Sequence, residues 1–288
     1  MSVRATRISE RVTPRGSART ALLLIGGAAF AALLAPHLAP FGPTDQLDPI
    51  NLANRAPYLS HLLGTDSYSR DVLSRLLHGA GVSLGIATAT VIVSLTLGTL
   101  VGAVAALAGG AVDALLMRAT DAALAFPRVL LVLLMASLLG ATPAPLLALL
   151  LGATGWMGCA RLVRGETRRL LAAPHIRGAR TIGLRSGALW WRHLLPGLAP
   201  SLAAAATIAF AAAIPLEAGL SFLGLGVPAP APSWGNIIAD AEGQLLRRWW
   251  LVAFPTLCIV ACAYAAHRAG EKLVERRGDA SRERTDGR

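Results

Sequence analysis

The sequence predicts an all-α integral membrane protein with six membrane-spanning helices and both termini in the cytoplasm. Of its 288 residues, 54% are hydrophobic and only 15% are charged, and the mean hydropathy is +0.56. Soluble globular domains carry about 25% charged residues. The chain also contains several apolar runs of the length that crosses a bilayer core as a helix, about 20 residues. These observations together indicate a bundle of transmembrane helices.

Six apolar runs are the predicted spans. The first follows a basic tail, residues 1–19, and is too long for the hydrophobic region of a signal peptide, so it is expected to remain as an anchor. The fourth is the shortest, and Gly109 and Gly110 separate the second from the third. The spans lie near 20–40, 83–107, 115–139, 145–160, 198–218 and 250–267.

The charge distribution predicts the orientation of these spans. The net charge is +11, and twenty Lys and Arg lie in the tail before residue 20, in the segment 161–197 and in the charged tail that ends the chain. Only five lie in 37–79 and 219–249. This asymmetry is the positive-inside rule with both termini cytoplasmic. A nucleic-acid surface is not expected, because the tails contain no aromatic residues among their Arg residues.

The segment 41–79 is expected to lie outside the membrane and to contain an interfacial helix. Thr65 or Asp66 can cap this helix, and its apolar stripe is Val72, Leu73, Leu76 and Leu77. A second outer segment contains three prolines between 228 and 232, which a continuous helix does not accommodate. Trp234 is expected to anchor that segment at the membrane interface.

Sequence signatures of catalysis and of metal binding are missing. The chain has a single lysine, Lys272, and no G-x-x-x-x-G-K-[ST] motif, so it is not expected to bind ATP itself. The three cysteines lie in apolar spans without ligand spacing, which favours helix packing over a zinc site or a disulfide. We therefore expect no catalytic residue, no cofactor and no metal in this chain.

Two acidic residues, Asp121 and Glu217, lie in or at the edge of apolar spans. A charge there costs about 2.5–3.5 kcal/mol, so a partner is expected. Arg161 is one candidate, and Arg118 and Arg128 are others. The sequence leaves open whether Asp121, Arg161 and Glu217 form a structural charge network or take part in transport.

Small residues indicate where helices pack closely. Gly98 and Gly102 lie on one helix face, and Gly81 and Gly85 repeat the same spacing. We expect both pairs to allow close contact with a neighbouring helix.

Residues 175–197, "HIRGARTIGLRSGALWWRHLLPG", form a basic segment on the predicted cytoplasmic side. Helical geometry places His175, Ala179 and Ile182 on one stripe, with Arg177 on the opposite side, and Gly183 ends the helix. A second helix then returns the chain to the membrane at Pro196. The pattern alone is compatible with a helix on the lipid surface or with a helix that docks on a partner.

This segment resembles the EAA loop of ABC importer permeases, in which a coupling helix docks into a cleft of the ATPase subunit. Ala179, Gly183, Leu195 and Pro196 match that loop. The residues that depart from it are Arg177, which replaces the Glu, Gly178, which replaces the middle Ala, and His175, which replaces the usual Tyr. The resemblance implies that residues 175–197 couple the chain to an ATPase.

Residues from about 61 to 257 are similar to the peptide and nickel branch of these permeases. The similarity is carried by several long motifs in the same order: "HLLGTDSYSRDVLSRLLHGAGVSL" (61–84), "DAALAFPRVLL" (121–131), "ARLVRGE" (160–166), "EAGLSFLGLGVPAPAPSWGNII" (217–238) and "WWLVAFP" (249–255). It implies a type I ABC importer permease fold, with an ABC transmembrane domain over 80–269 and a charged cytoplasmic tail over 270–288.

The resemblance implies one of two permease subunits of a bacterial inner-membrane importer. Its expected partners are a second permease, ATPase subunits that bind the ATP, and an extracytoplasmic solute-binding protein. Di- or oligopeptides are the expected substrates, with nickel or a metal chelate as the alternative. The competing classes are a stand-alone secondary transporter and a membrane-embedded enzyme, but the sequence shows neither internal repeats nor a nucleophile and base pairing.

Overall fold

The computed structural model describes residues 34–140, 142–181 and 186–286. Within these ranges the regular secondary structure is helical, apart from two isolated bridges in the segment before residue 72. Three helices are long and apolar enough to cross a membrane, and two bent helix pairs bring the number to five if each pair is one span. The predicted first span, 20–40, and the tail 1–19 fall almost entirely outside the described residues.

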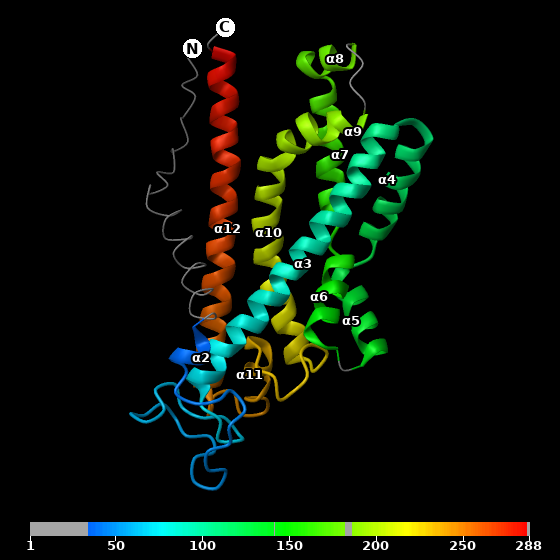
Figure 1. Cartoon of the computed structure of the whole chain (residues 1–288). Coiled ribbons are helices and arrows are strands. Elements are labelled where there is room, and N and C mark those ends of the chain that lie inside the picture. The colour runs from blue at the N-terminus through cyan, green and yellow to red at the C-terminus, as the bar shows by residue number, and fades with distance from the viewer. Residues whose placement is uncertain (1–33, 141, 182–185, 287–288) are drawn as a thin grey trace, which may run out of the picture.

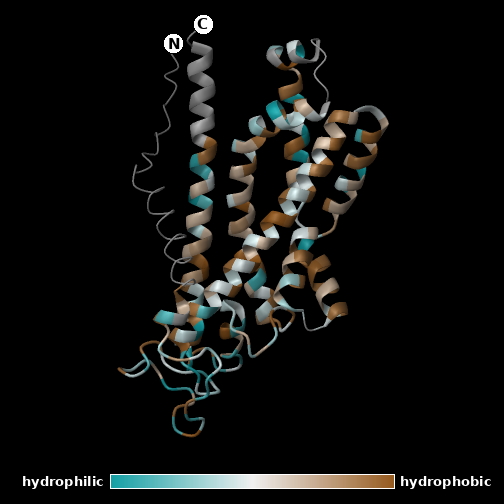
Figure 2. Ribbon diagram, in the orientation of Figure 1, coloured by the Kyte–Doolittle hydropathy of each residue, from teal (hydrophilic) through white to brown (hydrophobic). Residues whose placement is uncertain are grey.

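Helices run between two ends of the molecule (Figure 1). One end carries the short helix α8 and the C-terminal end of α12, and the other carries the segment before α3 together with α11. Hydrophobic residues run along the length of the bundle (Figure 2). The elements are α2 (Ala35–Leu38), α3 (Val72–Ala108), α4 (Gly110–Ala125), α5 (Arg128–Leu139), α6 (Ala144–Ala153), α7 (Met157–Leu171), α8 (Pro174–Thr181), α9 (Ser186–Leu189), the π-helix η1 (Trp190–Leu194), α10 (Leu195–Phe222), α11 (Trp234–Ala239) and α12 (Trp249–Asp286).

The helix α3 organises the bundle. At 1.5 Å per residue its 37 residues extend over about 56 Å, more than the roughly 30 Å of a hydrocarbon core. It packs against α6, α7 and α10, while α10 packs against α12. The predicted spans 198–218 and 250–267 therefore lie within the longer helices α10 and α12, and 83–107 lies within α3.

The predicted spans 115–139 and 145–160 are not continuous helices. Helices α4 and α5 meet at 81°, and α6 and α7 meet at 50°. Pro127 explains the first break, because proline restricts the residue before it to extended conformations, and Phe126 has φ −87° and ψ 133°. At the second break the chain passes through Thr154, which ends α6, and Gly155. Beyond the predicted fourth span, α7 continues as a helix to Leu171.

The prediction of a separate interfacial helix capped by Thr65 or Asp66 is wrong. Asp71 caps the helix, because its side chain accepts a hydrogen bond from the backbone N–H of Ser74, 2.8 Å away. The apolar stripe Val72, Leu73, Leu76 and Leu77 is therefore the first two turns of α3 itself. Trp234 also differs from expectation, because it is buried in the core between α3, α10 and α12 and donates through Nε1 to the carbonyl oxygen of Leu76.

Close helix packing occurs at one of the two predicted glycine pairs. A Cβ atom on Gly98 would lie 2.5 Å from Cβ of Cys159, and a Cβ atom on Gly102 would collide with the carbonyl oxygen of Ala160. These glycines therefore let α3 and α7 approach closely. A Cβ atom on Gly81 or Gly85 would have no neighbour within 4 Å, so the expected contact at this pair is not made among the described residues.

Candidate functional site

The segment between α7 and α10 folds back on itself at one end of the bundle. Ile176 of α8 is 1% exposed and packs in a cluster with Leu189 and Leu194 from the returning chain. Leu107 at the end of α3 packs against the same cluster. Arg177 and Gly178 lie on the exposed surface of α8. The helix is thus packed against its own chain through Ile176 and exposes Arg177 and Gly178.

The return to the bundle passes through a π-helix. Pro196 has no N–H to donate to a carbonyl group four residues earlier, and its ring would clash with that carbonyl in a regular α-helix. The backbone widens instead, and the N–H of Leu195 donates to the carbonyl oxygen of Trp190, five residues back. The Leu-Pro pair therefore sets the geometry with which the segment enters α10.

The predicted coupling residues are distributed along this segment. His175, Arg177, Gly178 and Ala179 lie in α8, and Leu195 and Pro196 are the first residues of α10. Ile182 and Gly183 lie outside the described residues, so the helix end at Gly183 stays a prediction. Ile176 was not singled out from the sequence. A large apolar residue in a basic helix could have indicated a buried contact at this position.

Acidic residues of α4 bind arginines of α7. Arg161 donates to Oδ1 of Asp121 from Nη2 at 2.5 Å, with exposed side-chain fractions of 52% and 58%. Asp113 binds Arg164 at 2.7 Å through Nη2 and also binds Arg168, and its own side chain is 7% exposed. These ion pairs tie α4 to the half of α7 that leads to α8.

Glu217 does not join this network. Its side chain is fully buried in α10, and its Oε1 accepts a hydrogen bond of 2.7 Å from Ser221. The hydroxyl groups of Ser83 and Ser233 also interact with the carboxyl group, while Oε2 has no partner at normal hydrogen-bond distance. The predicted set of Asp121, Arg161 and Glu217 is thus a pair plus a separate buried acid, because Glu217 faces serines of α3 and of the outer segment.

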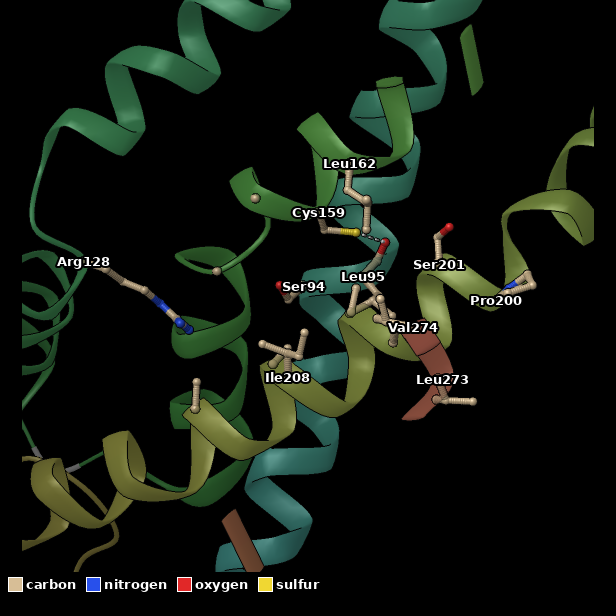
Figure 3. Close-up of a pocket in the computed structure, with 16 residues that line it drawn as sticks. Ser94, Leu95, Arg128, Cys159, Leu162, Pro200, Ser201, Ile208, Leu273 and Val274 are labelled. Atoms are coloured by element: carbon tan, nitrogen blue, oxygen red, sulfur yellow. Dashed lines mark hydrogen bonds between the residues drawn. The ribbon is translucent and has the colours of Figure 1, made fainter. Parts of the chain in front are cut away.

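A cavity of about 480 Å³ lies between α3, α7 and α10 (Figure 3). Its walls are mainly Gly, Ala and aliphatic side chains, with Ser94, Ser201 and Arg128 as polar groups. Leu273 and Val274 of α12 close one side, and Arg128 of α5 enters from another. Such a chamber can hold a small organic molecule and offers few groups for chemistry.

The end of the bundle that carries α11 is held by a buried charge cluster that the sequence did not predict. Arg70 and Arg75 both bind Asp66, at 2.6 and 2.5 Å, and both also bind Asp240, which follows α11. His61 lies 2.8 Å from Asp71 beside this cluster. Two Asp and two Arg within ten residues of an apolar chain could have indicated the ion pairs between residues 66 and 75. Nothing in the sequence pointed to Asp240 as a further partner.

These features define a class of protein, a multi-pass helical membrane protein with a cavity and an exposed helix at one end. Residues 98–277 match the family described as binding-protein-dependent transport system inner membrane component. The chain belongs to this family, whose members are membrane permease subunits of ABC transporters and work with an ATPase and a substrate-binding protein, and it is therefore a multi-pass protein of the inner membrane.

Relatives and a solved structure agree with that assignment. A peptide permease protein of Brucella suis biovar 1 is 36% identical over 272 residues, covering 93% of this chain and 88% of that protein. The dipeptide transport system permease protein DppC of Bacillus subtilis is 32% identical over 245 residues, covering 85% and 76%. The MetNI methionine ABC transporter, in inward-facing conformations, is similar in fold, with a TM-score of 0.54, 18% identity, and coverage of 70% of this chain and 97% of that chain.

Proposed function

We propose that this chain is one of two permease subunits of a bacterial importer for di- or oligopeptides. The permease role follows from the family, and the peptide substrate is supported by the names of the relatives from Brucella and Bacillus. The cavity is large enough for a small peptide, and its mainly small and aliphatic walls suit a substrate whose side chains vary. Nickel or a metal chelate is the less favoured cargo, because the relatives compared above are named for peptides.

The observation that carries the coupling mechanism is the position of α8. This helix connects α7 to α10 through η1, and α7 and α10 both line the cavity. ATP binds to the partner ATPase in this proposal, and closure of the ATPase dimer displaces α8. Because Ile176 packs α8 firmly on the returning chain, the displacement reaches both cavity walls.

The residues proposed to form the ATPase contact lie in the segment 175–197, which resembles the EAA loop. Arg177 and Gly178 are exposed on α8, and His175 and Ala179 belong to the same helix. Ile182 and Gly183 continue the segment, and Leu195 and Pro196 return it to the bundle. The pair of Asp121 and Arg161 holds α4 against α7 and has no contact with cargo in this proposal.

The proposed orientation places α8 and both chain termini in the cytoplasm, with six spans in all. The excess of Lys and Arg in 161–197 and in the C-terminal tail supports this side for α8 and for the end of α12. The segment before α3 then faces the solute-binding protein. The first of the six spans is the apolar run near 20–40.

Reconstitution tests the proposal. The chain is co-expressed with the second permease and the ATPases encoded beside it, purified, and placed in proteoliposomes with the binding protein. Uptake of a labelled dipeptide is expected to require ATP and the binding protein, and nickel uptake is measured in parallel. Uptake without any ATPase would favour a secondary transporter, and failure to form a complex with every neighbouring ATPase would overturn the proposal.

A further inference from the structure

We propose that Arg128 binds the carboxylate of the transported peptide within the cavity between α3, α7 and α10. This inference rests on the proposed peptide substrate. It assigns a recognition role to a residue that the coupling mechanism does not use.

The two helix breaks bring Arg128 to the cavity. It is the first residue of α5, directly after the 81° bend, and its side chain extends to the bend between α6 and α7 (Figure 3). Nη2 donates to the carbonyl oxygen of Leu151 at 2.8 Å, which fixes the guanidinium group beside the cavity. A Cβ atom on Gly155 would lie 2.8 Å from Nη2, so the glycine at this bend makes room for the guanidinium group.

Among the described residues, most of the N–H donors of this guanidinium group have no partner. A guanidinium group has five N–H donors, and the Leu151 carbonyl accepts from one nitrogen. Nε is buried without a partner, and no Asp or Glu side chain of the described residues forms an ion pair with Arg128. An unpaired charge inside a membrane span is costly, and such residues mark sites that meet a ligand or a water-filled path. The geometry thus leaves donors available to an anion.

A peptide carboxylate fits what remains. Every linear peptide with a free C-terminus carries one, whatever its side chains, and a guanidinium group binds carboxylates through two parallel N–H donors. The other polar side chains of the cavity, Ser94 and Ser201, carry no charge, and its remaining walls are small or aliphatic. One fixed cation in an otherwise undiscriminating chamber recognises the group that peptides share and ignores the groups in which they differ.

The test measures occupancy of the cavity in the complete complex without binding protein, in lipid nanodiscs. Leu162 lines the cavity and is 37% exposed, so Leu162→Cys, in a chain with Cys159, Cys258 and Cys262 changed to Ala, reports on ligand through its rate of maleimide labelling. The probes are a dipeptide and the same dipeptide with a C-terminal amide. Both are titrated against the labelling rate.

The free acid is expected to protect at a concentration about tenfold lower than the amide, the factor that one charge-assisted hydrogen bond supplies. Arg128→Lys keeps most of this difference, and Arg128→Gln abolishes it. Arg118→Gln, a change at an exposed arginine of α4, is the matched control and leaves it intact. Uptake of the dipeptide by the unlabelled complex tests the proposed function independently.

Three results would overturn the inference. The first is equal protection by acid and amide, or no protection by either, in the complex with Arg128. The second is a preference for the acid that persists in Arg128→Gln, because another group would then read the carboxylate. The third is failure of Arg128→Gln to assemble with the second permease while Arg128→Lys assembles, since Arg128 would then pair with an acid of that subunit.

Discussion

The Oδ2 atom of Asp66 lies 2.5 Å from Nη1 of Arg75, and the two side chains are 0% and 3% exposed. Arg75 belongs to the first turn of α3, and the same nitrogen also binds Asp240 beyond α11. The carboxylate of Asp66 also accepts hydrogen bonds from Nε and from the backbone N–H of Arg70. One carboxylate thus joins the segment before α3 to the start of α3 and, through the arginines, to the segment before α12.

Asp66→Asn is expected to destabilise this outer end strongly. The substitution leaves two buried arginines with Asp240 as their remaining anion, and breaking a buried ion pair from one side costs about 3–5 kcal/mol. Thermal unfolding of the purified chain in detergent measures the effect. Asp45→Asn is the control, since Asp45 is exposed and accepts only from the nearby backbone of Gly42. Equal melting temperatures for the two variants would show that the buried cluster contributes little.

Gly102→Ala is expected to destabilise the contact between α3 and α7. The added Cβ would collide with the Ala160 carbonyl oxygen and lie 2.9 Å from Cβ of Val163, and overpacking of this kind costs about 1–3 kcal/mol. Gly81→Ala is the same change on the same helix in open space and is expected to be neutral or slightly stabilising. Size-exclusion profiles of both variants after heating provide the comparison. Equal losses in the two would contradict the assigned packing role of Gly102.

The sequence predicted the position of three long apolar helices because length and apolarity are local properties. It placed 83–107, 198–218 and 250–267 inside α3, α10 and α12. It missed the sharp bend at Pro127, since a proline in an apolar run is also compatible with a mild kink. It also assigned the helix cap to Thr65 or Asp66, whereas Asp71 caps the helix. Asp66 instead binds Arg70 and Arg75, and the second partner of these arginines, Asp240, lies at least 165 residues further along the chain.

The candidate site was predictable in outline and not in detail. The helix over 175–181 followed from local pattern, but the residue buried beneath it is Ile176, because α8 packs on the chain that returns through Leu189 and Leu194. Arg128 was weighed as a partner for buried acids, yet its guanidinium group turns to the Leu151 carbonyl. Both outcomes depend on which segments meet in three dimensions, and a single sequence does not contain that information.

Glu217 is expected to serve the structure of the outer end. Ser221 donates to its Oε1 and also accepts from the backbone N–H of Val227, so the carboxyl group helps to hold the turn after α10. Glu217→Gln keeps an acceptor at this place and is expected to preserve dipeptide uptake, whereas Glu217→Leu leaves buried hydroxyl donors unpaired at about 1–3 kcal/mol. Uptake and thermal unfolding are measured on both variants. Loss of uptake in Glu217→Gln at unchanged stability would indicate a direct role of the acid in transport.

Arg177→Glu is expected to weaken association with the native ATPase. Arg177 is exposed on α8 at the position where the EAA loop of ABC importer permeases carries Glu. The cognate ATPase is therefore expected to present a surface that accepts a positive charge. Placing a like charge against that surface raises the Kd by about tenfold or more, while an exposed substitution leaves the stability of the permease almost unchanged. Titration of the ATPase onto the permease pair in nanodiscs measures the Kd. Arg118→Glu, at an exposed arginine of α4, controls for a general effect of charge. If Arg177→Glu tightened the complex instead, the ATPase surface would suit the family's usual Glu, and Arg177 would contribute nothing to the choice of partner.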